Sequence, residues 1–129
     1  MSVEIVKQMF DAFERGDVPG IASLVSEDCQ FDHREAYDVP INGLFTGPDG
    51  VAEFFRILGE TQEVTVFETD EFLEAGNRVV VLGRYGFRVR ATGKEWVSDY
   101  AMTYTVENGL VTHWKPIHDM GAEAVAFGV

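Results

Sequence analysis

The sequence predicts an α+β fold in which helices come first and a meander of antiparallel strands follows. Apolar residues recur at helical spacing in most of the first 60 residues, whereas the segments after residue 62 alternate between apolar and polar residues. Short turns such as Asn108-Gly109 separate the alternating segments and are typical of two-residue hairpins. Segregated helices and strands of this kind indicate a sheet that is covered by helices on one face.

Composition narrows the class of protein. The chain has 129 residues, which suits one domain spanning residues 1–129. Ten Lys and Arg stand against 22 Asp and Glu, for a formal net charge of -12, which argues against binding to nucleic acids or to anionic membranes. The lone Cys29 excludes an internal disulfide and a cysteine-based zinc site. No signal peptide or transmembrane stretch is evident, so we expect a cytoplasmic protein.

Three helices are predicted in the first half of the chain. Ser2 is placed to cap the first helix, and Gly16 is placed to end it in a left-handed conformation. Asp17 is expected to cap a short second helix that has Pro19 in its first turn. A third helix begins at residues 47–49 and is expected to end at Gly59. The apolar stripe of the first helix consists of Val3, Val6, Met9, Phe10 and Phe13.

The strands are expected to have one aromatic face. The first strand covers Cys29–Arg34 and places His33 on the same side as Phe31, and residues 35–47 are expected to be a loop. The later strands are expected at Val64–Leu73, Arg78–Arg90, Glu95–Val106 and Leu110–Asp119. Their inward rows include Tyr85, Phe87, Trp96, Tyr100, Met102, Tyr104, Trp114, Pro116 and His118. An opposite row contains Arg84, Arg88 and Arg90, which meet solvent or a second subunit, and the apolar tail 122–129 is expected to pack over the pocket or on a partner.

A series of short signposts spans nearly the whole chain. In order they are Phe10-Asp11-Ala12-Phe13, Gly16-Asp17, Glu27-Asp28, Gly43-Leu44-Phe45-Thr46-Gly47, Phe54-Phe55, Thr92-Gly93-Lys94 and Asn108-Gly109. With these signposts the sequence resembles the nuclear transport factor 2-like superfamily, in its SnoaL-like, ketosteroid isomerase-related branch. The resemblance implies a cystatin-like α+β barrel, in which a cone-shaped, curved antiparallel or mixed sheet and the N-terminal helices enclose an apolar pocket.

The resemblance also implies where catalytic groups would lie. Ketosteroid isomerases have an Asp base on the first strand, where this chain has His33, and a Tyr donor on the first helix, where it has Phe10. Their second Asp falls near Met102, with Tyr100 as the nearest inward donor. Limonene epoxide hydrolases use an Asp-Arg-Asp arrangement with a Tyr and an Asn. This chain lacks that set, since the matching positions read Tyr85, Gly83 and Pro116, with Phe31 and His33. The acidic residue of SnoaL-type cyclases matches Asp119 or His118, of which strand alternation places His118 on the aromatic side.

Candidate catalytic residues are His33, Tyr100, Tyr85 and His118. An imidazole that titrates near neutral pH can abstract a proton next to a carbonyl group, and a tyrosine hydroxyl can donate to the oxyanion that forms. The alternative is that His33 is a hydrogen-bonded core residue and the tyrosines only pack. The expected walls of a ligand pocket are Phe10, Phe31, Phe54, Phe87, Met102, Tyr104, Trp114 and Pro116.

Two hypotheses for function follow. The chain is an isomerase, cyclase or hydratase that acts on a small hydrophobic carbonyl compound, with His33 as the acid-base group. Alternatively, it is a non-catalytic domain for binding hydrophobic ligands or for dimerisation, as a homodimer through the outer sheet face. No cofactor is expected. A metal site is not expected either, because His113 and His118 alternate onto opposite faces of one strand and no paired histidine spacing occurs.

Overall fold

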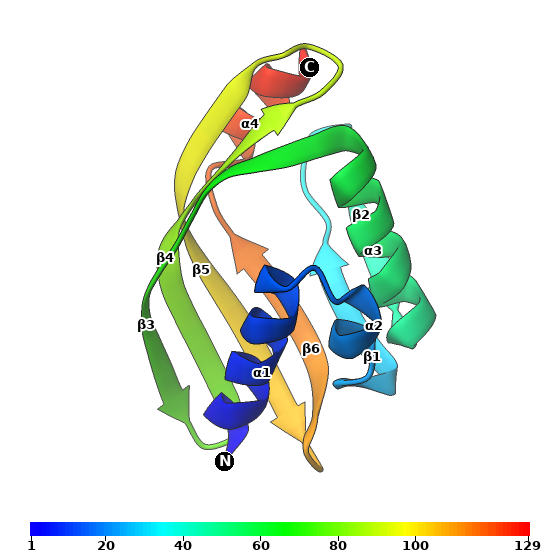
Figure 1. The fold of residues 1–129 in the computed structure, drawn as a ribbon, viewed down its shortest axis with the longest axis vertical. Helices are drawn as coiled ribbons and strands as arrows, with labels where there is room; N and C mark the ends of the chain where they lie inside the picture. The colour runs from blue at the N-terminus through cyan, green and yellow to red at the C-terminus, as the bar shows by residue number, and fades with distance from the viewer.

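A computed structural model describes all residues, 1–129, and confirms the α+β fold (Figure 1). The helices are α1 (Ser2–Glu14), α2 (Val18–Ala22), α3 (Gly47–Thr61) and α4 (Met120–Phe127). The strands are β1 (Val25–His33), β2 (Gly43–Thr46), β3 (Gln62–Ala75), β4 (Arg78–Val89), β5 (Glu95–Glu107) and β6 (Leu110–Ile117). They form one sheet in the order β2-β1-β6-β5-β4-β3, in which only β1 and β6 run parallel. The sheet is therefore mixed, and β2 and β3 are its two edges.

The sheet curves around the three N-terminal helices. Figure 1 shows α1 lying across the sheet, α3 beside β1 and β2, and α4 at the end of the molecule away from the N-terminus. The inward residues of β4, β5 and β6 are buried as strand alternation predicted, among them Tyr85, Tyr100 and Trp114. Arg84 and Arg88 are exposed on the outer side. None of the four helices has both the length and the apolar character needed to cross a membrane.

Local signals explain most helix ends. The side chain of Asp17 accepts a hydrogen bond from the backbone of Gly20 at 2.9 Å, and Gly16 adopts a φ of 69° directly after α1, as predicted. Two predicted ends were wrong. Met1 rather than Ser2 is the N-cap of α1, so Ser2 already lies inside the helix. Helix α3 continues past Gly59 to Thr61, because this glycine costs too little helix stability to stop a helix that packs on β1.

Two segments for which no helix or strand was predicted are ordered elements. Residues 43–46 of the predicted loop form β2, which pairs antiparallel with β1 and places Gly43 opposite His33. This strand has only four residues, too few for alternation to reveal it. The apolar tail is helix α4, in which the side chain of Asp119 accepts a hydrogen bond from the backbone of Ala122 at 2.9 Å. Helix α4 packs against β4 and β5 and buries Glu123.

Gly83 on β4 lies between Thr69 of β3 and Tyr100 of β5. A Cβ atom at this position would overlap the carbonyl oxygen of Glu68 and lie 2.6 Å from the hydroxyl of Tyr100. We expect Gly83→Ala to lower the free energy of unfolding by about 1–3 kcal/mol, measured by urea denaturation, because the sheet must shift to admit the methyl group. The matched control is Gly59→Ala in α3, whose Cβ would meet no atom within 4 Å and which should raise it by about 0.5–1 kcal/mol. Equal stability of Gly83→Ala and wild type would contradict this packing.

Candidate functional site

An apolar cavity lies between the helices and the concave face of the sheet. Its volume is ≈ 80 Å³, which is room for several water molecules, since one needs roughly 10–15 Å³. It is lined by 20 residues, of which 16 are hydrophobic. The predicted wall residues surround it with one exception, Pro116, which is buried but does not line the cavity. The others are Phe10, Phe31, Phe54, Phe87, Met102, Tyr104 and Trp114.

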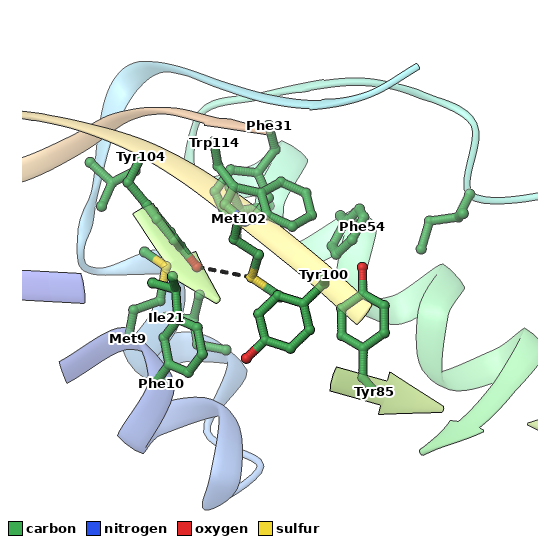
Figure 2. Close-up of a cluster of buried hydrophobic side chains, with 14 of the residues drawn as sticks. Met9, Phe10, Ile21, Phe31, Phe54, Tyr85, Tyr100, Met102, Tyr104 and Trp114 are labelled. Carbon is green, nitrogen blue, oxygen red and sulfur yellow. Dashed lines mark hydrogen bonds between the residues drawn. The ribbon is translucent and has the colours of Figure 1, made fainter. Parts of the chain in front are cut away.

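The tyrosines of the inner face have different roles. Figure 2 shows Tyr85 and Tyr100 stacked, with ring centroids 4.6 Å apart and hydroxyls that point to different sides. The hydroxyl of Tyr100 lies 3.1 Å from that of Thr69, and Tyr100 does not line the cavity. The hydroxyl of Tyr104 donates to the sulfur of Met102 at 3.4 Å, the dashed line in Figure 2. Only Tyr85 brings a hydroxyl to the polar groups described next.

His33 lies at the end of β1 with its ring against the aromatic wall. The side chain is 6% exposed, and its ring centroid lies 5.6 Å from that of Phe54 and 6.1 Å from that of Trp114. Nδ1 of His33 lies 3.2 Å from Oε2 of Glu35, whose side chain is completely buried. This contact lacks hydrogen-bond geometry, and neither Nδ1 nor the Glu35 carboxylate has a hydrogen-bond partner. Buried polar atoms without partners cost about 1–3 kcal/mol each, so they often mark a functional site.

A second polar group comes from three separate elements. His118 follows β6, and its side chain is 2% exposed. Its Nδ1 lies 2.6 Å from the hydroxyl of Tyr85 on β4, and its Nε2 lies 3.1 Å from Oε1 of Glu123 on α4. The side chains form a chain of hydrogen bonds, Tyr85–His118–Glu123, at one end of the cavity. This second group lies beside His33 of the first, since the ring centroids of His33 and His118 are 5.7 Å apart.

Two of these polar residues escaped sequence reasoning. Glu35 was assigned to an exposed loop, although residues two apart in an extended chain share a face and Glu35 is two residues after His33. Glu123 was hidden in a tail of alanines and valines, and an acid at the centre of an apolar segment was the signal that could have revealed it. Asp119, the other acid considered near the last strand, caps α4 and does not line the cavity.

Burial shifts the pKa values of the three hydrogen-bonded side chains, Tyr85, His118 and Glu123, and the direction differs between them. Burial raises the pKa of Glu123 to about 8, and the negative charge of Glu35 adds to this effect. Burial lowers the pKa of His118 to about 4, with a further contribution from the nearby imidazole of His33. Burial and the acidic neighbours also raise the pKa of Tyr85 well above its ordinary value. At neutral pH, His118 is therefore uncharged, Glu123 is mostly protonated and Tyr85 keeps its proton, a pattern typical of functional sites.

The polar groups are also close enough to consider a metal ion. One ligand atom each from His33, His118 and Glu123 lies within 4.8 Å of the others, whereas His113 is exposed on the opposite side of β6. This clustering was not foreseen from the sequence. Both ring nitrogens of His118 already have hydrogen-bond partners, so an ion would have to replace the bond to Glu123. The hydrogen bonds account for the positions of His118 and Glu123, whereas Nδ1 of His33 has no partner.

Comparison with known proteins identifies the family. The model of the SnoaL-like domain matches residues 6–114. An NTF2-like protein from Burkholderia xenovorans is similar over 97% of this chain and 94% of its own, with 30% identity and a TM-score of 0.87. The chain belongs to the SnoaL-like family, within the nuclear transport factor 2-like fold, as the sequence resemblance indicated.

Other solved structures share this fold. An NTF2-like protein from Burkholderia thailandensis matches 96% of this chain and 95% of its own, with 26% identity and a TM-score of 0.87. TerC, which was co-crystallised with polyporic acid, matches 99% of this chain and 98% of its own, with 24% identity and a TM-score of 0.81. A search of curated proteins finds no match.

Burial of Glu123 makes stability depend on pH. The pKa of this carboxyl group rises from 4.5 to about 8 on folding, so the folded state binds more protons than the unfolded state in this interval. The contribution of Glu123 to the free energy of unfolding therefore falls as pH rises from 4.5 to 8, whereas His118, whose pKa is lowered from 6.5 to about 4, contributes in the opposite sense below pH 6.5. We expect Glu123→Gln to remove this fall. The free energy of unfolding of the variant relative to that of wild type should therefore be higher at pH 8 than at pH 5.

Urea denaturation at pH 5, 6, 7 and 8 measures this difference. The control is Glu107→Gln, which neutralises an exposed carboxylate at the end of β5. Its curve should run parallel to the wild-type curve. Parallel curves for Glu123→Gln and wild type would show that Glu123 is not perturbed in the folded state.

Proposed function

We propose that the protein is an enzyme that binds a small hydrophobic carbonyl compound in the cone and moves a proton next to the carbonyl group. The observation that carries this proposal is the pair of polar groups, His33 with Glu35 and Tyr85–His118–Glu123, buried at the wall of an apolar cavity. Apolar residues would fill these positions at lower cost in free energy. Titratable groups that are buried together beside a cavity are typical of acid-base catalysis.

The groups divide into a base and a hydrogen-bond donor. His33 takes the proton from the carbon next to the carbonyl group, and the carboxylate of Glu35, 3.2 Å from Nδ1, stabilises the imidazolium that results. The hydroxyl of Tyr85 donates to the enolate oxygen as negative charge develops there. Return of the proton to another carbon gives an isomerisation. Loss of water from the enolate gives an elimination, which is the reverse of the hydratase reaction. Aromatic walls exclude water, which strengthens both interactions.

The cavity restricts the size of the compound. Pockets for drug-sized ligands occupy about 300–1,000 Å³, whereas this cavity has ≈ 80 Å³. A cavity that binds benzene has roughly 150 Å³, so a compound of a few carbon atoms fits here without movement of the walls, and a ring requires side chains to rotate. The co-crystallisation of TerC with polyporic acid supports a small-molecule role for a protein of this fold.

Loss of the imidazole should separate binding from chemistry. A thermal-shift screen of small cyclic and linear ketones first identifies a compound that binds the wild type, and NMR then measures exchange of its α-protons with deuterium in D₂O. We expect His33→Ala to retain the thermal shift and to slow exchange roughly 10²- to 10⁴-fold, the usual contribution of a general base. His113→Ala, which removes an exposed histidine from β6, is the control and should match wild type. Binding without any exchange in the wild type would favour the alternative, a ligand-binding domain without chemistry.

Removal of the Glu35 charge should weaken the base without removing it. We expect Glu35→Gln to slow α-proton exchange by about 10-fold or more, because the imidazolium of His33 loses its neighbouring negative charge. The same change should lower the pKa of Glu123, since Glu35 contributes to raising it. The matched control is Glu63→Gln, an exposed glutamate that pairs with Arg88 on the sheet surface. Unchanged exchange in Glu35→Gln would place this carboxylate outside the mechanism.

A further inference from the structure

We infer that Glu123 controls whether the hydroxyl of Tyr85 can donate a hydrogen bond to a ligand, by selecting which ring nitrogen of His118 carries the proton. Glu123 thereby acts as a positioning residue for the donor side of the site. The ligand it favours is a hydrophobic compound with an acceptor oxygen, such as a carbonyl. The inference about the ligand rests on the proposed function, whereas the behaviour of His118 does not.

The hydrogen bonds of His118 couple Tyr85 to Glu123. His118 has one neighbour at each ring nitrogen, the hydroxyl of Tyr85 at 2.6 Å and a carboxyl oxygen of Glu123 at 3.1 Å. A neutral imidazole has one N–H donor and one acceptor nitrogen. Whatever Glu123 requires of Nε2 therefore decides what Nδ1 offers to Tyr85. All three side chains line the same cavity, so the consequence reaches a bound ligand.

With Glu123 protonated, its hydroxyl donates to Nε2 of His118. The ring proton then resides on Nδ1 and is donated to the oxygen of Tyr85. The hydroxyl of Tyr85 then has no acceptor for its own proton among its protein partners. It is available to donate a hydrogen bond to a ligand oxygen in the cavity. With Glu123 ionised, the carboxylate can only accept, so the ring proton moves to Nε2 and Nδ1 accepts the phenolic proton. Tyr85 then offers a ligand only its lone pairs.

The surroundings of Glu123 keep it near the balance between these states. Burial and the carboxylate of Glu35 favour the protonated form, and the nearby side chain of Gln62 favours the ionised form. The indole of Trp96 donates to the amide oxygen of Gln62 at 2.8 Å, which leaves the NH₂ group of Gln62 as its free donor. The titratable groups that face the chain are His33 and Glu35 from β1 and the following residues, Tyr85 from β4, Tyr100 and Tyr104 from β5, and Asp119 at the start of α4.

Nitrogen NMR observes the inferred switch directly and needs no ligand. In protein labelled with ¹⁵N-histidine, with EDTA present to remove stray metal ions, the two ring nitrogens have distinct shifts in each tautomer. We expect His118 to be the Nδ1–H tautomer at pH 6 and to convert to Nε2–H as the pH passes about 8, where Glu123 ionises. His118→Asn assigns the signals by removing them. An Nε2–H tautomer at pH 6, or a tautomer that does not change with pH, would overturn the inference.

Two variants separate this switch from a structural effect. Glu123→Gln cannot ionise, so the tautomer of His118 should become independent of pH, while Glu107→Gln should leave the wild-type transition unchanged. Glu35→Gln is the second variant, in case Glu123→Gln does not fold, and it should move the transition to lower pH because one cause of the raised pKa is removed. A transition at the wild-type pH in both variants would assign it to a group other than Glu123.

A ligand experiment then tests the consequence for Tyr85. With cyclohexenone as the probe, the dissociation constant of the wild type should rise about 10-fold between pH 6 and pH 9, the value of one lost hydrogen bond of about 1.4 kcal/mol. In Tyr85→Phe, binding should be weaker at pH 6 and should not vary with pH. A tautomer switch with no cyclohexenone binding would count against the proposed function and leave the role of Glu123 toward His118 intact. Binding that varies equally in Tyr85→Phe would overturn the role of Tyr85 as the controlled donor.

Discussion

The architecture depends on the burial of one continuous row of aromatic side chains along the concave face of the sheet. Phe31 on β1 and Trp114 on β6 face each other across the parallel pair, with ring centroids 4.5 Å apart. Tyr100 pairs with Gly83 on β4, where a Cβ atom would lie 2.6 Å from the hydroxyl of Tyr100. Aromatic side chains contribute the largest buried apolar area of any residue, so helices that cover this row supply much of the stability of the fold. Sheet curvature and the placement of α1 and α3 follow from this requirement.

The same aromatic row determines the chemistry of the polar groups that it surrounds. An apolar environment penalises charge, which is why Glu123 holds its proton at neutral pH while His118 gives up its own. The chain of three side chains is therefore uncharged, and its hydrogen bonds are stronger than they would be in water. Glu35 and His33 are different, because their buried atoms have no hydrogen-bond partner within the protein. The site therefore has two parts. Tyr85, His118 and Glu123 already bond to one another, whereas His33 and Glu35 have polar atoms without a protein partner.

Membership of the SnoaL-like family defines the cone but not the reaction, because one fold can support many activities. The sequence resemblance located His33, at the position where ketosteroid isomerases have their base. It did not supply the neighbours of this residue, since Glu35 lies in the segment after β1 and His118 follows β6. A reaction can be inferred only from the groups that this chain places around its own cavity.

The sequence alone determined the three N-terminal helices, the long strands and the face on which each strand residue lies. Alternation with a period of two is a local property of extended backbone, so Tyr85, His118 and His33 could be assigned to the inner face without knowledge of the fold. The tertiary structure alone decided that Glu35 and Glu123 are buried beside them. Their burial depends on the path of the chain after β1 and on the docking of α4 against β4 and β5. These are contacts between distant parts of the chain, and the local signals, the spacing of Glu35 from His33 and the acid within the apolar tail, do not specify them.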